Sequence, residues 1–308
     1  MNTRKDLSQA VTAEFPAHHF TATWTPLDVD LGAATHQGYV RKNNEDHYLV
    51  MRFVRSLENL LTNLDEHILD HSYTLTGYGM LVADGIGGMA GGEVASRLAL
   101  TKLVKLLVDT PDWIMSLKRA EDIDHVLHRM SERFLLIDKS LREKAKSDVT
   151  LHGMGTTLTV AATLGNDLVI GHIGDSRAYH LRSNNLTQLT KDHTLAQALI
   201  DAGVAGRDDP AARSMRHVLT AALGSMDEGL EPQVQTLKMM RGDRLLLCTD
   251  GLTDMVDDKT ITRVLNETDA SQQACQKLID LALAGGGLDN ITMVVAHFKS
   301  PDRSTTSH

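Results

Sequence analysis

Residues 156–181, TTLTVAATLGNDLVIGHIGDSRAYHL, contain three short apolar runs. The runs cover 156–161, 168–173 and 177–181, and Gly, Asn and Asp stand between them. Runs of this length separated by turn residues are typical of strands joined by tight turns. Strands joined in this way lie antiparallel, so these residues predict antiparallel sheet in the middle of the chain.

Similar patterns extend outward in both directions. Further strands are predicted at 27–31, 47–51, 79–83, 234–239, 243–248 and 290–297. Helical spacing of apolar residues predicts helices at 92–108, 120–146, 261–265 and 270–284, and a polar helix-prone segment at 192–216. Strands joined by tight turns, with long helices grouped in sequence, favour an α+β fold in which helices cover antiparallel sheets.

The domain organisation is predicted from the same patterns. Residues 1–26 are weakly patterned and are expected to form a loosely ordered arm, and 27–298 are expected to form a single domain. Leucines at helical spacing predict a helical insertion at 55–72. The Ser- and Thr-rich residues 299–308 are expected to be a disordered tail.

Composition excludes several classes of protein. Of the 308 residues, 42% are hydrophobic, and Asp and Glu outnumber Lys and Arg by 40 to 31. This acidic balance argues against a general nucleic-acid binder. No run approaches the roughly 18 apolar residues of a membrane span, and the N-terminus lacks the apolar core of a signal peptide. Cys248 and Cys275 are best interpreted as buried free thiols in a cytoplasmic protein.

Aspartate beside glycine recurs where predicted strands end or begin. Asp84, Asp175 and Asp250 each follow an apolar strand, and Asp289 precedes the last strand. A single pair of this kind is most often a turn or a helix cap. Four such aspartates, if they converge, place carboxylates so close that their mutual repulsion would be costly unless cations neutralised it. Oxygen ligands favour Mg²⁺ or Mn²⁺ over zinc.

A charged segment, Arg41-Lys42-Asn43-Asn44-Glu45-Asp46, precedes the strand predicted at 47–51. Considered alone it is a charged turn. The guanidinium of Arg41 is nevertheless suited to phosphate oxygens, and Glu45 and Asp46 add carboxylates beside it.

The order of these motifs resembles the metal-dependent protein phosphatase family, the type 2C serine/threonine phosphatases, in its bacterial form. The resemblance covers roughly residues 31–298, and its specificity lies in the ordered set rather than in any one motif. In chain order the motifs are Arg41-x-x-Asn44-Glu45-Asp46, Ala83-Asp84-Gly85-x-Gly87-Gly88, Gly92-Glu93-x-Ala95-Ser96, Gly155-Thr156-Thr157, Gly174-Asp175-Ser176-Arg177, Asp192-His193-Thr194, Leu223-Gly224, Asp250-Gly251-Leu252-x-Asp254 and Asp289-Asn290.

The resemblance implies a four-layer α-β-β-α sandwich of two antiparallel sheets flanked by helices. It also implies a core site for two Mg or Mn ions. Asp84 matches the residue that bridges the two ions, and the carbonyl of Gly85 matches a ligand of one of them. Asp250 and Asp289 match ligands of the first ion.

Other positions are implied in the same way. Glu45 and Asp46 match the acidic pair beside the second ion, which acts directly or through water. Asp175, together with Asp250 and Asp254, matches the ligands of a weaker third ion. The segment 192–216 matches the mobile flap of bacterial members.

The resemblance also implies a mechanism. Arg41 matches the arginine that holds the substrate phosphate, Asp84 is the second expected catalytic residue, and Asn290 matches a group that orients its neighbouring carboxylate. Water activated by the metals attacks phosphorus directly, without a phospho-enzyme. Met89 and Ile86 stand where some members carry histidine, so the general acid for the leaving group stays unassigned.

Three functions are compatible with these residues. The first is a serine/threonine phosphoprotein phosphatase, whose partners are phosphoserine and phosphothreonine proteins. The second is a phosphatase for a small phosphate ester, and the third is an inactive relative that binds phosphoproteins or a kinase. The presence of Asp84, Asp250 and Asp289 favours an active enzyme. Whether a cognate protein kinase exists as a partner is left open.

Overall fold

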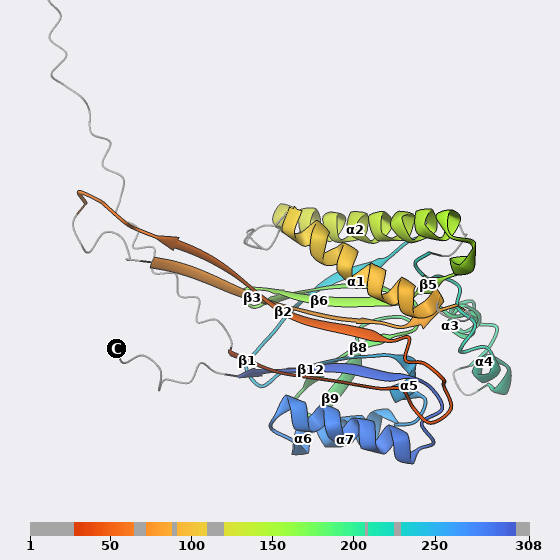
Figure 1. Cartoon of the computed structure of the whole chain (residues 1–308). Helices are drawn as coiled ribbons and strands as arrows, with labels where there is room; N and C mark the ends of the chain where they lie inside the picture. The colour runs from red at the N-terminus through yellow and green to blue at the C-terminus, as the bar shows by residue number, and fades with distance from the viewer. Residues whose placement is uncertain are drawn as a thin grey trace, which may run out of the picture.

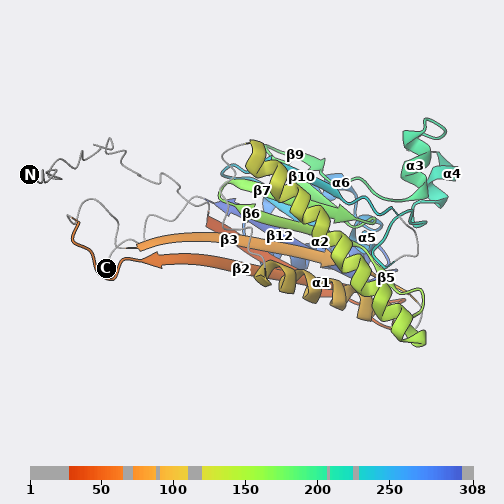
Figure 2. The ribbon, with the colours of Figure 1, turned by 90° about the horizontal axis from the view of Figure 1, so that it is seen from above.

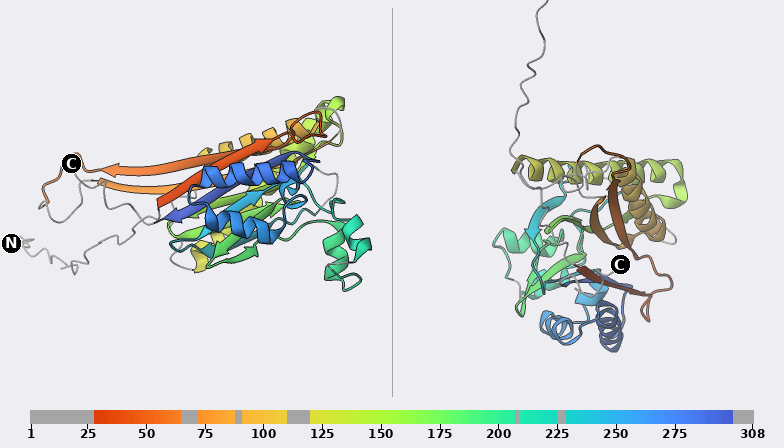
Figure 3. Two further views of the ribbon diagram at one scale, coloured as in Figure 1. Left: turned by 90° about the horizontal axis from the view of Figure 1, so that it is seen from below. Right: turned by 90° about the vertical axis from the view of Figure 1, so that its left-hand side faces the viewer.

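Two five-stranded sheets are stacked face to face, with helices on both outer faces (Figure 1). The computed structural model describes residues 28–64, 72–87, 91–109, 120–206, 209–224 and 229–299. The predicted α-β-β-α sandwich of antiparallel sheets is confirmed. Figure 3 shows the molecule from below and, on the right, from one end, where the four layers lie one above another.

The first sheet has the strand order β1-β12-β11-β8-β9, and its neighbours pair antiparallel. All five residues of β11 are buried, and they alternate between two cores. Leu245 and Leu247 pack between the sheets, whereas Leu246 and Cys248 pack against helices. The strands are β1 (Asp28–His36), β8 (Arg177–Arg182), β9 (Asn185–Gln188), β11 (Arg244–Cys248) and β12 (Ile291–Lys299).

The second sheet has the order β10-β7-β6-β3-β2 and is also antiparallel. A separate two-stranded pair, β4 with β5, lies at the end of β3. The bounds are β2 (His47–Glu58), β3 (Ser72–Ala83), β4 (Gly85–Ile86), β5 (Gly155–Thr156), β6 (Leu158–Leu164), β7 (Asp167–Ile173) and β10 (Gln233–Lys238). The predicted strands all appear among the described residues, and β9 is a strand that the sequence did not predict.

Helices α1 and α2 cover the second sheet (Figure 2), and α6 and α7 cover the first (Figure 1). Leu103 of α1 and Phe134 of α2 enter the core above the second sheet. Cys275 of α7 is buried against the first sheet. The helices are α1 (Gly91–Asp109), α2 (Ala120–Ser147), α3 (Leu195–Asp201), α4 (Pro210–Ser214), α5 (Asp250–Thr253), α6 (Asp258–Glu267) and α7 (Ser271–Ala284). None of the helices in the described part of the chain is both long and apolar enough to cross a bilayer.

In the residues described within 55–72, the predicted helical insertion is not helical. Strands β2 and β3 pair along their whole length, from His47 with Ala83 to Glu58 with Ser72. Residues 55–58 are therefore strand, and 59–64 are not helical. The leucines have helical spacing, but a helix here would need a surface against which to pack its apolar side. Residues 55–58 instead satisfy their backbone hydrogen bonds by pairing with β3. Residues 65–71 lie outside the described residues.

The two predicted terminal segments have different outcomes. The arm at 1–26 lies outside the described residues. Strand β12 continues to Lys299, whose ammonium donates to Asp269 Oδ2 at 3.1 Å, so the predicted tail does not begin at 299. Residues 300–308 lie outside the described residues.

Candidate active site

A cleft of about 970 Å³ lies where several strands end at one edge of the two sheets. Antiparallel pairing creates this edge, because the end of β3 at Ala83 lies opposite the start of β2 at His47. In the first sheet, Cys248 at the end of β11 pairs with Met293 near the start of β12. Loops that precede one strand and follow its neighbour are thus brought together.

Three of the predicted aspartates meet in this cleft. One carboxylate oxygen from each of Asp84, Asp175 and Asp250 lies within 4.8 Å of the others. Burial, followed by the charge of neighbouring aspartates, raises the pKa of Asp84 well above its usual value. Burial and the charge of Asp250 raise the pKa of Asp175 to about 8. Carboxylates so close together favour protonation or a bound cation.

The donor set of this cleft fits a divalent metal. The ligand atoms are carboxylate oxygens, which Mg²⁺ and Mn²⁺ prefer. Among the described residues, the buried Oδ1 atom of Asp250 has no hydrogen-bond partner. A cation beside Asp84, Asp175 and Asp250 would satisfy this oxygen and offset the repulsion among the three carboxylates.

Glu45 and Asp46 occupy different positions. Glu45 lines the cleft, and its backbone N–H donates to Asn290 Oδ1 at 2.8 Å. Asp46 is 5% exposed and is not one of the described residues that line the cleft. Its Oδ2 accepts a hydrogen bond of 2.8 Å from Thr249 Oγ1, and burial raises its pKa to about 7. Asp46 is therefore buried behind the cleft wall, beside Thr249.

Arg41 and Asp289 form an ion pair at the rim. Arg41 Nη2 lies 2.6 Å from Asp289 Oδ2, and this hydrogen bond raises the pKa of the guanidinium. The Arg41 side chain is 55% exposed, so the face of the fork away from Asp289 is accessible to a ligand.

Asn290 holds the loop that carries Arg41. Its Nδ2 donates to the carbonyls of Gln37 and Asn43 at 2.8 and 2.9 Å, and its Oδ1 accepts from Glu45 N. Its own backbone N–H donates to Asp289 Oδ1 at 2.8 Å. Asn290 thus positions the loop of Arg41 through its side-chain amide and the carboxylate of Asp289 through its backbone N–H.

Glycine is required at two positions because the backbones pack closely. A Cβ at Gly85 would lie 2.2 Å from Gly92 O, and a Cβ at Gly251 would lie 2.0 Å from Asn290 O. Backbone on both sides leaves no room for a side chain. These contacts bring α1 against β4, and α5 against the start of β12.

Asp254 belongs to a second group at the same cleft. One ligand atom from each of His217, Asp250 and Asp254 lies within 4.8 Å of the others. Asp250 is thus shared by two groups, and Asp175 and Asp254 belong to different ones. Burial raises the pKa of Asp254.

Arg216 and His217 are site residues that the sequence did not predict. Arg216 Nη2 lies 3.5 Å from Asp254 Oδ2, and His217 Nδ1 lies 3.4 Å from Asp250 Oδ2. A hydrogen bond to Asp250 raises the pKa of His217. The β-bridge between Thr194 and Leu219 places Arg216 and His217 at the cleft. No local sequence pattern predicts this position.

Comparisons with known proteins agree with this geometry. A model described as protein phosphatase 2C matches residues 63–281. The serine/threonine protein phosphatase PstP of Mycobacterium tuberculosis is 37% identical over 227 residues, which are 74% of this chain and 41% of PstP. This chain therefore spans about two fifths of the length of that relative.

Two further matches cover most of the matched protein. The serine/threonine phosphatase stp of Listeria welshimeri is 35% identical over 216 residues, or 70% of this chain and 82% of stp. The crystal structure of the PstP catalytic domain in complex with two manganese ions matches at a TM-score of 0.67 and 34% identity. It covers 87% of this chain and 97% of that domain.

Proposed function

The chain belongs to the protein phosphatase 2C family, and we propose that it is a metal-dependent phosphatase that hydrolyses phosphoserine and phosphothreonine esters in proteins. The observation that carries the proposal is the convergence of Asp84, Asp175 and Asp250 within 4.8 Å in a cleft. Two Mg or Mn ions in the core site, with a weaker third, are the proposed cofactors. PstP, solved with two manganese ions, supports this assignment.

Each carboxylate has a proposed role toward these ions. Asp84 and the carbonyl of Gly85 hold the core pair, with Asp250 and Asp289 as further ligands. Glu45 contributes from the cleft wall. Bound divalent cations supply a water of lowered pKa and positive charge for the phosphoryl oxygens.

Two acidic residues have more distant proposed roles. Asp46, which lies behind the wall, acts through water. Asp175 and Asp254 lie on either side of Asp250 and are proposed ligands of the weaker third ion, each in a group that includes Asp250. Asn290 keeps Asp289 in place through its backbone hydrogen bond.

Arg41 is the proposed phosphate-binding residue. Its ion pair with Asp289 fixes one edge of the guanidinium, and the exposed edge faces the substrate. The guanidinium then neutralises charge that develops on the phosphoryl oxygens as the bond to the leaving group breaks.

Water is the proposed nucleophile. Among the described residues that line the cleft, Thr157 is the one that carries a hydroxyl. Its Oγ1 accepts from Asp84 N at 2.9 Å and lies 2.8 Å from Ser176 Oγ. A hydroxyl so occupied argues against a phosphothreonine intermediate, and the proposal is direct attack by water without a phospho-enzyme. A role opposite a protein kinase follows as part of the proposal, and the free buried Cys248 and Cys275 support a cytoplasmic location.

The test is hydrolysis of an aryl phosphate and of a phosphothreonine peptide with Mn²⁺, with Mg²⁺ and with a chelator. Turnover that requires metal and prefers the peptide is expected. Asp84→Asn and Asp250→Asn are expected to reduce kcat by about 100-fold or more. The control is Asp280→Asn, an exposed carboxylate of α7 that accepts from Gln276.

Two outcomes would contradict the proposal. Metal binding without turnover of either compound would indicate the inactive, phosphoprotein-binding relative. A preference for the small ester over every phosphopeptide would indicate a small-molecule phosphatase.

A further inference from the structure

The outer halves of β2 and β3 form a two-stranded ribbon, residues 52–58 and 72–78, that projects from the body at the end opposite α3 and α4 (Figure 2). The cleft lies at the other end of these strands, where β2 begins and β3 ends. Strand β6 pairs with β3 from Gly79 to Val82, and at the base of the ribbon Tyr78 N donates to Thr163 Oγ1 of β6 at 2.8 Å. Beyond Tyr78, no third strand of the described residues pairs with the ribbon. A hairpin without a third strand or a covering helix is marginally stable in water. The ribbon therefore needs a partner for its apolar side chains.

The end of this ribbon is apolar and exposed. Along β2, Val54 near the base of the ribbon is 46% exposed, and Leu57 near its outer end is 52% exposed. In the adjoining residues 59–64, here called the tip, Leu60 and Leu61 are 80% and 97% exposed. Leucines this exposed at the end of a projecting ribbon are typical of a surface that another molecule covers.

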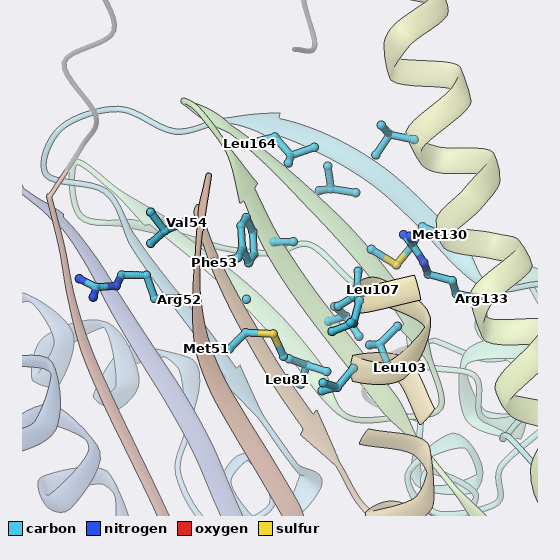
Figure 4. A pocket seen from close by; sticks show the side chains of 17 residues that line it. Met51, Arg52, Phe53, Val54, Leu81, Leu103, Leu107, Met130, Arg133 and Leu164 are labelled. Carbon is cyan, nitrogen blue, oxygen red and sulfur yellow. The ribbon is translucent and has the colours of Figure 1, made fainter. Parts of the chain in front are cut away.

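A cavity of about 430 Å³ lies at the base of the same ribbon. Figure 4 shows Phe53 of β2, Leu107 of α1 and Met130 of α2 around this space. Most of its lining is aliphatic, and three of the lining residues, Arg52, Val54 and Val108, are exposed to solvent. The cavity therefore opens where the ribbon leaves the body.

We propose that the ribbon pairs with the ribbon of a second copy of this chain, and that the tip leucines of each copy enter the cavity of the other. Tip and cavity lie at opposite ends of one ribbon. When two ribbons pack antiparallel about a two-fold axis, each tip is brought to the base of its partner. Such an interface is isologous, because the same surface serves on both copies.

The charges on β2 favour this orientation. Arg52 and Arg55 lie toward the base of the ribbon and Glu58 lies at its outer end, and all three are exposed. Antiparallel packing directs each Glu58 toward the arginines of the other copy, whereas parallel packing would align like charges. The outer edge of β2 is also the edge of its sheet, so its backbone groups are available for pairing between copies.

The test is the molar mass of the full chain in solution, measured by light scattering and sedimentation up to high micromolar concentration. A concentration-dependent dimer is expected. Leu60→Asp and Leu61→Asp place a charge on the tip, and Val108→Asp places one at the cavity opening, and each is expected to weaken dimerisation by about 10-fold or more. Leu136→Asp is the matched control, because this leucine of α2 is 45% exposed and does not line the cavity.

Charge reversal tests the orientation independently. Glu58→Arg is expected to weaken the dimer, and the double variant Arg55→Glu with Glu58→Arg is expected to restore most of the affinity. A wild-type chain that stays monomeric at every concentration would overturn the proposal. A dimer that survives the tip and cavity variants would overturn it as well, since the interface would then lie elsewhere. Metal-dependent hydrolysis of an aryl phosphate is expected to be unchanged in all these variants, so this test is separate from that of the proposed function.

Discussion

Arg41 enters the cleft from the loop between β1 and β2, and its position depends on contacts made far away in the sequence. Asp289 holds its guanidinium, and Asn290 holds the carbonyls of Gln37 and Asn43 on either side of it. At the residue scale, the cleft is thus built from a few polar side chains that each bind two or more partners. Substitutions at such positions affect geometry as well as charge.

We expect Arg41→Lys to reduce kcat/KM for a phosphate ester by about 10-fold and Arg41→Ala by about 100-fold, because the lysine keeps the charge but loses the planar fork. Steady-state kinetics with saturating Mn²⁺ measure this. Arg263→Ala, at an exposed arginine of α6 near Glu267, is the control and should leave both constants unchanged. Equal activity of the two Arg41 variants would contradict a role that depends on the guanidinium.

At the scale of elements, α5 and the start of β12 approach so closely that Gly251 has no space for a Cβ. This contact places Asp250 at the first turn of α5 beside Asp289 and Asn290. The strand ends thus supply the carboxylates, and close packing between backbones sets their separation.

Gly251→Ala is expected to destabilise the fold by about 1–3 kcal/mol and to reduce metal-dependent turnover, because either α5 or the chain at Asn290 must shift. Denaturant unfolding and kinetics together measure both effects. Gly206→Ala is the control, since a Cβ there meets nothing within 4 Å. A Gly251→Ala variant with wild-type stability would show that this contact can relax.

At the scale of the whole molecule, both sheets direct carboxylates to one edge, and the resulting repulsion opposes folding in the absence of a cation. The prediction is that Mn²⁺ at about 100-fold above its Kd raises the melting temperature by roughly 5–10 °C, from a binding contribution of about 2.7 kcal/mol. Asp84→Asn is expected to lose most of this increase and to be at least as stable as the wild type in chelator, since one repelling charge is gone. Calorimetry with and without metal measures both quantities. Asp280→Asn should retain the full increase, and an Asp84→Asn variant that also retained it would contradict the assignment.

The stability of the whole fold should also depend on pH through His172. Its ring is buried on β7, its Nδ1 lies 2.8 Å from Thr159 Oγ1, and burial lowers its pKa to about 3. The neutral ring of the folded state is favoured above the unfolded pKa of about 6.5, and this contribution is lost as the pH falls toward 3.

Between pH 6.5 and pH 5 we expect the wild type to lose about 1–2 kcal/mol more than His172→Gln in the free energy of unfolding. Urea unfolding at several pH values measures this difference. His128→Gln, at a side chain of α2 that is 72% exposed, should follow the wild type. Asp46 and Asp175 have raised pKa values, so they stabilise the folded state as the pH falls, opposite to His172. The quantity that tests the prediction is therefore the difference in pH dependence between wild type and His172→Gln. Parallel pH profiles for wild type and His172→Gln would contradict the prediction.

Local patterns in the sequence were sufficient to predict most strands and the long helices α1, α2 and α7. Asp84, Asp175 and Asp250, which the structure brings together, could be selected as candidates because a carboxylate beside glycine at the end of an apolar strand is a local feature. The helical prediction failed in the described part of 55–72 because Leu57, Leu60, Leu61 and Leu64 have helical spacing, while pairing with β3 is a distant interaction. Arg216 and His217 were missed for the same reason, since their approach to Asp250 and Asp254 depends on the bridge from Thr194 to Leu219.

The residue types at the strand ends, and the family through the order of the motifs, could be inferred from the chain alone. The folded structure was needed to show that Asp84, Asp175 and Asp250 lie in one cleft, that Asp46 is buried behind its wall, and that a ribbon and a cavity lie at the opposite end. The difference comes from the range over which the interactions act. The apolar and turn patterns act over a few residues, whereas the separation of carboxylates and the exposure of a hairpin follow from how two sheets pack.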